Sequence, residues 1–164
     1  MIRSVLPSDA GRIAEIYNYY IEKTIITFEE EPVTEDDILQ RIEVITQKGF
    51  PFFAYIDDSD ILMGYAYLSN WRSRSAYDIT LETSVYIDSN QNSKGLGTIL
   101  YSALIEEAKK IGVHSLIGGI SLPNEISRKL HEKFGFELVG NFRECGKKFN
   151  RYIDVEFWQL FIKP

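Results

Sequence analysis

Apolar residues follow two different spacings along the chain, and the changes between them mark the expected helices and strands. Recurrence every three or four residues, as at Ile13, Ile16 and Tyr17, predicts a helix, whereas a run of branched and aromatic residues predicts a strand. Thr34, with Asp37 three residues on, opens the second helix as an acidic capping box. The expected elements are a strand over 2–5, a helix entered at 7–9, a helix after 34, strands over 52–56, 61–68 and 81–87, a helix from 96, a strand over 113–120, a helix over 124–133, and strands over 136–140 and 152–162.

The order of these elements, βααβββαβαββ, predicts an α/β (α+β) fold. Helices interspersed among the strands are expected to cover both faces of a mixed sheet. The chain has 164 residues, of which 45% are apolar, and this is enough material for one core. Because no linker, repeat or low-complexity tract interrupts the pattern, we expect residues 1–164 to form a single domain.

Charge and composition exclude several classes of protein. The net charge of −6 argues against an extended nucleic-acid surface, which requires a basic face. No apolar run approaches the roughly 18 residues of a membrane span, and the N-terminal residues do not resemble a signal peptide, so we expect a cytoplasmic protein without a membrane partner. Cys145 is the only cysteine and His114 and His131 are the only histidines, which predicts neither a disulfide nor a metal site.

The segment from Leu81 to Leu104 combines a strand, a polar turn and a helix in a way that suits anion binding. Lys94-Gly95-Leu96-Gly97 stands where the helix begins. The first turn of a helix has unpaired N–H groups at the positive end of the helix dipole, and glycines allow a phosphate to come close. An isolated Gly-x-Gly is more often an ordinary turn, but its position between strand and helix favours a phosphate site. A nucleotide P-loop is disfavoured because Lys94 precedes the glycines.

The chain resembles, over almost its whole length, the GNAT superfamily of acetyl-CoA-dependent N-acetyltransferases, and the motifs that carry this resemblance lie between Asn70 and Gln159. The pyrophosphate motif of that superfamily is Gln or Arg, two residues, Gly, one residue, then Gly or Ala, and it corresponds here to Asn92–Gly97. Four further segments resemble the phosphinothricin and methionine sulfoximine acetyltransferases within it, namely Asn70-Trp71-Arg72-Ser73-Arg74-Ser75-Ala76-Tyr77, Glu82-Thr83-Ser84-Val85-Tyr86-Ile87, Leu122-Pro123-Asn124 with Ser127-Arg128-Lys129-Leu130-His131-Glu132, and Asp154-Val155-Glu156-Phe157-Trp158-Gln159.

This resemblance implies a mostly antiparallel GNAT-like sheet and a binding site for acetyl-CoA. The implied cofactor-binding residues are Val85, Tyr86, Ile87, Ser93, Lys94, Gly95, Leu96, Gly97, Thr98, Asn124 and Ser127. Asn92 and Ser93 depart from the family pattern, which has Gln or Arg at the first position and commonly Gly at the second. We therefore expect a cradle that binds the cofactor more weakly than usual.

Two residues are candidates for proton transfer. Glu82, on the strand beside the cofactor segment, is the expected base, since apolar neighbours should raise the pKa of its carboxyl. The alternative is a solvated glutamate on a strand face. The family often has a tyrosine seven residues after the asparagine to protonate the CoA thiolate, and His131 stands in that position here. Its alternative is a helix-end histidine paired with Glu132.

The acceptor implied by the resemblance is a small amino-acid-like amine of the phosphinothricin, methionine sulfoximine or methionine sulfone type. Arg72, Ser73 and Arg74 are the expected carboxylate site, because two arginines spaced two apart in an extended segment point the same way, and Phe28 is an expected pocket wall. Surface arginines and a core phenylalanine are the alternatives. Other acceptors, such as a protein N-terminus or a polyamine, and a non-catalytic acyl-CoA-binding module remain as competing functions. Relatives are commonly dimeric, so a homodimer is also expected.

Overall fold

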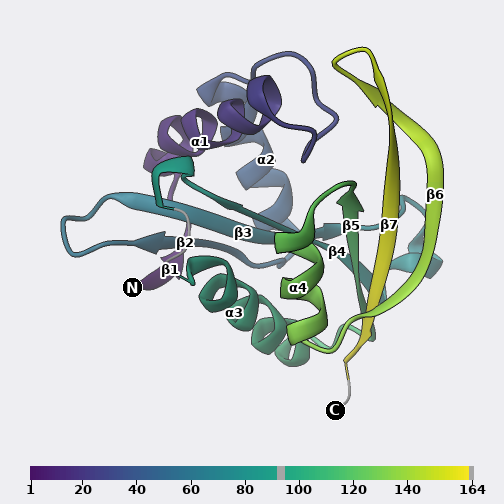
Figure 1. The fold of residues 1–164 in the computed structure, drawn as a ribbon. Helices are drawn as coiled ribbons and strands as arrows, with labels where there is room; N and C mark the ends of the chain where they lie inside the picture. Colours follow the sequence, from purple (N-terminus) through teal and green to yellow (C-terminus); the bar gives the residue numbers. More distant parts are fainter. Residues whose placement is uncertain (92–94, 163–164) are drawn as a thin grey trace.

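The computed structural model of the chain describes residues 1–91 and 95–162 and contains eleven main elements in the expected order βααβββαβαββ (Figure 1). Short 3-10 turns at Pro7–Asp9, Ser75–Tyr77 and Ser89–Gln91 accompany them. The main elements are β1 (Ile2–Ser4), α1 (Ala10–Lys23), α2 (Glu35–Gln47), β2 (Phe52–Ile56), β3 (Leu62–Asn70), β4 (Thr80–Ile87), α3 (Leu96–Lys110), β5 (Ser115–Ser121), α4 (Glu125–Lys133), β6 (Glu137–Lys148) and β7 (Arg151–Phe161).

The strands form one seven-stranded sheet in the order β1-β2-β3-β4-β5-β7-β6. Among the described strands, every neighbouring pair is antiparallel except β4 with β5. The prediction of a mixed, mostly antiparallel sheet is thus confirmed. The parallel pair lies at the centre of the sheet, and α3 is the crossover that connects its two strands (Figure 1).

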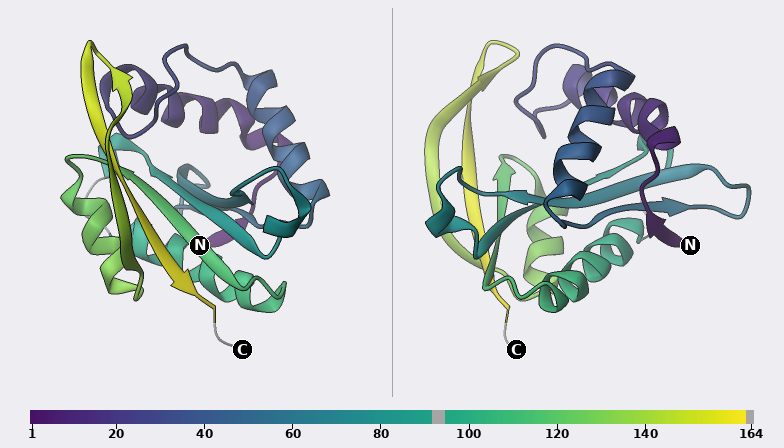
Figure 2. Two further views of the ribbon diagram at one scale, coloured as in Figure 1. Left: turned by 90° about the vertical axis from the view of Figure 1, so that its right-hand side faces the viewer. Right: turned by 180° about the vertical axis from the view of Figure 1, so that it is seen from behind.

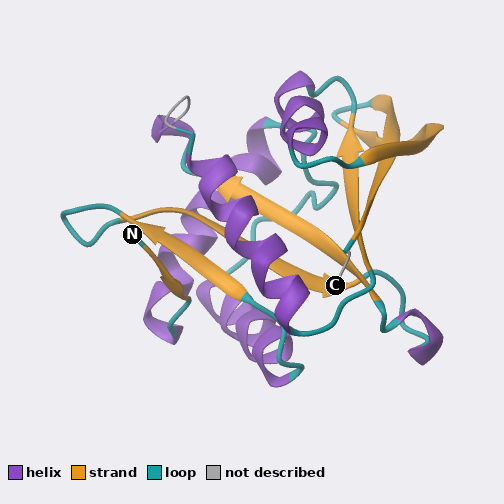
Figure 3. Cartoon of the chain, turned by 90° about the horizontal axis from the view of Figure 1, so that it is seen from below, coloured by secondary structure: helices purple, strands orange, loops and turns teal. Residues whose placement is uncertain are grey.

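Helices cover both faces of this sheet, as the element order predicted. α1 and α2 pack their isoleucines against the face of β2 and β3 that carries Phe52 and Tyr65. α3 packs against the opposite face, where Leu68, Leu81 and Leu116 are fully buried, and α4 lies beside it (Figures 1 and 3). The alternation of side chains along each strand therefore divides the core into two apolar layers.

The start of α2 shows how local sequence positions an element. The Thr34 hydroxyl accepts a hydrogen bond from the backbone N–H of Asp37 (3.2 Å), and the Asp37 carboxylate accepts one from the backbone N–H of Thr34 (2.8 Å). This reciprocal pair satisfies N–H groups that would otherwise have no partner at the helix end. The capping box expected from the sequence is therefore present.

The prediction for the C-terminal strands was wrong in one respect, because β6 continues well past residue 140. It runs to Lys148 and pairs with β7 along a long hairpin, with register shifts at Leu138/Gly140 and Phe142/Gly146. Glycines and charged residues at 140–148 obscure the alternating pattern, and the strand exists because β7 satisfies its backbone groups. The curved hairpin reaches over the sheet toward the loop between α1 and α2 (Figures 1 and 2).

No helix among the described residues combines the length and the apolar character that crossing a bilayer would require.

Candidate active site

β4 and β5 separate from each other at the centre of the sheet. Their parallel pairing extends only over Thr80–Glu82 and Ser115–Ile117, although β4 continues to Ile87 and β5 to Ser121. From Thr83 onward β4 has a paired strand only on its β3 side, within the described part of the sheet, so backbone N–H and C=O groups on its other edge face a gap. Such an edge is suited to hydrogen-bonding an extended ligand.

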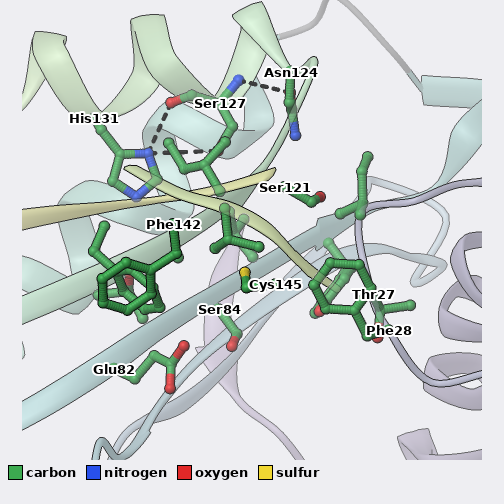
Figure 4. Close-up of a pocket in the computed structure, with 18 of the residues that line it drawn as sticks. Thr27, Phe28, Glu82, Ser84, Ser121, Asn124, Ser127, His131, Phe142 and Cys145 are labelled. Atoms are coloured by element: carbon green, nitrogen blue, oxygen red, sulfur yellow. Dashed lines mark hydrogen bonds between the residues drawn. The ribbon is translucent and has the colours of Figure 1, made fainter. Parts of the chain in front are cut away.

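A cavity of about 440 Å³ occupies this gap. It is lined by β4 and β5, by the start of α4, by the loop between α1 and α2, and by the β6–β7 hairpin (Figure 4). Side chains on β4 alternate between the two faces of the sheet. Glu82 and Ser84 face the side of the sheet covered by α1 and α2, whereas Thr83 and Val85 face the side covered by α3 and α4. The gap therefore connects two chemically different half-sites.

Glu82 occupies the half-site on the α1 and α2 side, next to Gly119 of β5. A Cβ built on Gly119 would lie 3.5 Å from the Glu82 Oε1 atom, so only a small residue leaves room for this carboxyl. Burial raises the pKa of Glu82, and the positive charge of Arg72 partly opposes that rise. A carboxylate with a raised pKa facing a cavity has the property that a general base requires.

His131 occupies the other half-site, on α4, where it is only 4% exposed. Its Nδ1 atom lies 2.7 Å from the Ser127 carbonyl oxygen and its Nε2 atom lies 2.8 Å from the Tyr101 hydroxyl. A carbonyl oxygen only accepts, so the neutral ring donates at Nδ1 and accepts from Tyr101 at Nε2. Its partners are thus Ser127 and Tyr101, and not Glu132. Burial lowers the pKa of His131, which favours this neutral form.

The network continues from Tyr101 back to β4. The Tyr101 hydroxyl lies 2.6 Å from the Thr83 hydroxyl, so three side chains bridge α4, α3 and β4 beneath the gap. Gly118 makes room for it, since a Cβ at that position would lie 2.1 Å from the His131 Nε2 atom. The sequence analysis did not identify Tyr101 or Thr83, because both fall at positions that look like ordinary core.

Phe28 lines the cavity, as expected for a pocket wall, and the β6–β7 hairpin holds it there. Its ring lies directly on the backbone of Gly146, where a Cβ would be 2.4 Å from the ring. The neighbouring Thr27 carbonyl accepts a 2.8 Å hydrogen bond from the Nζ of Lys148, which is 2% exposed. Thus the loop between α1 and α2 and the hairpin are fastened together over the acidic half-site.

The expected arrangement of Arg72, Ser73 and Arg74 was wrong. Residues 71–74 form a bend leading into a 3-10 turn, and not an extended segment, so the two arginines are not aligned by strand geometry. All three are exposed and none lines the cavity in the described structure. The Arg72 guanidinium lies over the Trp71 ring at 4.8 Å, near enough to Glu82 to influence its pKa.

The expected cofactor residues fall into three groups. Val85, Tyr86, Asn124 and Ser127 line the cavity, and the Asn124 side chain caps α4 by accepting from the Ser127 N–H (3.0 Å). Ile87 does not line it, and its backbone N–H and C=O both form hydrogen bonds with the Tyr20 hydroxyl. The third group is the expected phosphate cradle. Two of its residues, Ser93 and Lys94, lie outside the described residues. The others stand at the start of α3, beyond the end of β4, and are Gly95, Leu96, Gly97 and Thr98.

The start of α3 has the backbone geometry of an anion site. Gly95 precedes the helix with φ 72° and ψ 9°, a left-handed conformation that favours glycine. The amides of the following first turn have no partners within the helix and point toward its N-terminal end. Other cavity-lining residues were not anticipated from the sequence, among them Ser121, Phe142, Cys145 and Phe157. These four come from strands that meet the site only through long-range pairing.

The described residues contain no group of three or more His, Cys, Asp or Glu arranged to hold a metal.

A model of the acetyltransferase (GNAT) domain matches residues 2–157. The chain belongs to the GNAT acetyltransferase family. It is 34% identical to a phosphinothricin N-acetyltransferase of Streptomyces coelicolor, covering 96% of this chain and 94% of the relative. It is equally identical to an L-methionine sulfoximine/L-methionine sulfone acetyltransferase of Pseudomonas paraeruginosa, covering 99% and 95% of the two chains. Both comparisons confirm the resemblance seen in the motifs.

The fold agrees with solved members of the family. A GNAT phosphinothricin acetyltransferase from Sinorhizobium meliloti in complex with acetyl-CoA superimposes with a TM-score of 0.96 at 32% identity, covering 99% of this chain and 88% of that one. The chain described here is therefore also an acetyl-CoA-dependent N-acetyltransferase. The expected enzyme class and cofactor are therefore confirmed.

Proposed function

We propose that this acetyltransferase transfers the acetyl group of acetyl-CoA to the α-amine of a small amino-acid-like acceptor, of the phosphinothricin, methionine sulfoximine or methionine sulfone type. The observation that carries the proposal is the placement of Glu82. Its carboxyl, with a raised pKa, faces the cavity where β4 and β5 part, on the opposite side of the sheet from the His131 and Tyr101 pair. Two relatives that match nearly the whole chain have names that describe such acceptors.

The cofactor fits the half-site on the α3 and α4 side. Acetyl-CoA supplies an activated thioester when it is bound. The unpaired edge of β4 at Val85 and Tyr86 offers backbone groups to the pantetheine arm, and the Asn124 amide, whose oxygen caps α4, has its N–H₂ group available for the same arm. The left-handed Gly95 and the first turn of α3 offer amides to the pyrophosphate. The acetyl group would then reach through the gap toward Glu82.

The proton transfers follow from the two half-sites. Glu82 takes a proton from the acceptor ammonium, directly or through a water, which frees the amine to attack the thioester carbonyl. As the new C–N bond forms and the C–S bond breaks, the departing sulfur takes up the proton of the Tyr101 hydroxyl, which His131 holds in place through its accepting Nε2 atom. The attacking nitrogen sheds its second proton to water, and a proton from water restores the Tyr101 hydroxyl. No covalent enzyme intermediate is required, because the two proposed half-sites would bring acceptor and thioester into direct contact.

We propose that Arg72, which does not line the cavity but acts on the charge of Glu82, forms a carboxylate site beside that residue. Its charge already acts on Glu82, so an acceptor carboxylate bound between Arg72 and the gap would hold the α-amine near the base. We propose that Ser73 and Arg74 of the same bend complete this site. Arg72→Ala should raise the KM for methionine sulfone with little effect on the KM for acetyl-CoA, and an unchanged acceptor KM would contradict this assignment.

The experiment that tests the function is a panel of acceptors assayed for CoA release. Phosphinothricin, methionine sulfoximine and methionine sulfone should be acetylated with much higher kcat/KM than spermidine or a peptide with a free N-terminal alanine. Glu82→Gln should abolish most of this turnover and leave the binding of acetyl-CoA intact. The proposal fails if the polyamine or the peptide is the better acceptor. An absence of thiol release with every amine would favour a non-catalytic acyl-CoA-binding module.

A further inference from the structure

Ser121 is the last residue of β5 and is 6% exposed, yet its hydroxyl has no hydrogen-bond partner in the described structure. The side chain lies in the wall of the cavity (Figure 4). A buried hydroxyl without a partner is unfavourable, because folding removes its hydrogen bonds to water and returns none. A ligand that enters the cavity would supply the missing partner.

The strand register places Ser121 in the acceptor half-site. It pairs with Val155 of β7, and it shares a face of β5 with Gly119, which lies against Glu82. The His131 side of the site is on the other face, above Gly118. The Ser121 hydroxyl therefore faces the same half-site as the proposed base.

The surroundings make this hydroxyl distinctive. Phe28, Phe142 and Phe157 are apolar walls of the cavity. Two other hydroxyls nearby already have partners, since that of Thr27 bonds to Tyr17 and that of Ser84 to Tyr67. Ser121 consequently offers an unused donor and acceptor in a cavity wall that also contains three phenylalanines.

The spacing matches an amino-acid acceptor. Ser121 lies two residues beyond Gly119 on the strand, which is roughly 6.6 Å along β5. The α-nitrogen and the side-chain sulfur of methionine sulfone are four bonds apart, roughly 5 Å in an extended chain. With the amine at Glu82, an oxygen on that sulfur would come within hydrogen-bond reach of Ser121.

We infer that Ser121 is a specificity-determining residue whose hydroxyl donates a hydrogen bond to an oxygen at the end of the acceptor side chain. Resting on the function proposed above, this selects amino acids that end in a sulfone, sulfoximine or phosphinate group over apolar ones of equal length. An apolar side chain in the same place would leave the hydroxyl as unpaired as it is without ligand, so it would gain no such bond.

The test compares two acceptors that differ only in side-chain oxygens, methionine sulfone and methionine. In the wild-type enzyme the sulfone should have the higher kcat/KM. Ser121→Ala should lower kcat/KM for the sulfone about tenfold, the effect of one hydrogen bond worth about 1.4 kcal/mol, and should change the value for methionine less than twofold. Ser121→Thr keeps a hydroxyl and should retain the preference. The matched control is Ser115→Ala, which removes a buried hydroxyl from the same face of β5 outside the cavity.

The possible results separate this inference from the function on which it rests. Equal losses with both acceptors, or no loss with either, would overturn the role of Ser121 while the function stands. An increase in the KM for acetyl-CoA shared by both acceptors would assign the hydroxyl to the cofactor and would also overturn it. If the wild-type enzyme acetylates none of methionine sulfone, methionine sulfoximine and phosphinothricin, the proposed function fails, and the role of Ser121 fails with it.

Discussion

Gly146 provides the sharpest test of how the acceptor half-site is built, because the Phe28 ring lies against its backbone. A Cβ at position 146 would be 2.4 Å from the Phe28 Cζ atom, whereas carbon atoms in contact are about 3.6 Å apart, so Gly146→Ala must displace the ring by about 1.2 Å. The backbone of Gly146 is not left-handed, so alanine itself introduces no backbone strain.

The displacement should affect binding more than folding. Phe28 is 41% exposed, so its ring has room to move toward solvent, and we expect a loss of less than about 1 kcal/mol in the free energy of unfolding. The acceptor would lose an apolar contact equal to one or two methylene groups, worth about 1–2 kcal/mol, or a 5- to 30-fold increase in its KM. The KM for acetyl-CoA should stay within twofold, because the cofactor half-site lies on the other face of the sheet.

Steady-state kinetics with varied acceptor and saturating acetyl-CoA measure this effect. The matched control is Gly140→Ala, which is also on β6 but has nothing within 4 Å of the added methyl group. In a Phe28→Ala background, Gly146→Ala should have no further effect on the acceptor KM, since the ring that it displaces is gone. The reasoning would be refuted if Gly146→Ala changes the acceptor KM equally with and without the phenylalanine, or leaves it unchanged in both.

Three other predictions concern the two half-sites. Glu82→Gln should reduce kcat by a factor of about 10² to 10⁴ at neutral pH, and single-turnover acetyl transfer at the wild-type rate would show that another group is the base. Because burial raises the pKa of Glu82, the acidic limb of a kcat/KM pH–rate profile should lie above the ordinary glutamate range. The charge of Arg72 opposes that rise, so Arg72→Ala should move the limb to still higher pH. A shift to lower pH would contradict this origin of the pKa. Gly118→Ala should drive the buried His131 ring away from Tyr101 and lower the free energy of unfolding by about 2–3 kcal/mol in urea titration, whereas wild-type stability would mean that the ring has room to move.

Much of the fold follows from patterns that are local in sequence. Three local patterns predicted elements that the tertiary structure contains. They are the helical spacing of apolar residues in 10–47, the capping box at Thr34 and the strand pattern at 81–87. The far part of β6 was missed because its residues, such as Gly146 and Lys147, have weak strand preference by themselves. Pairing with β7 provides the stabilisation that the local sequence lacks.

The candidate site likewise has parts that could be predicted from local sequence and parts that could not. Glu82, His131 and Asn124, which the motifs singled out, all line the cavity, and each belongs to an element that was itself predictable. The geometry of the Arg72 segment was not predictable, because the same residues can form a bend or an extended strand. Which of the two they adopt depends on contacts with residues far away in the sequence. The relation between Tyr101 and His131 was equally hidden, because helices α3 and α4 are separate in sequence and meet only through the sheet.

By itself the sequence determined the order of the elements, the two apolar layers and the acetyl-CoA-dependent family, because periodic burial and short motifs are encoded within a few neighbouring residues. Only the tertiary structure decided that β4 and β5 part after Glu82, that Glu82 and His131 lie on opposite faces of that gap, and that Ser121 has an unpaired hydroxyl in the wall of the same cavity. These features depend on strand register and on which glycine lies opposite which side chain. Such relations arise between residues far apart in the chain, so no local pattern contains them.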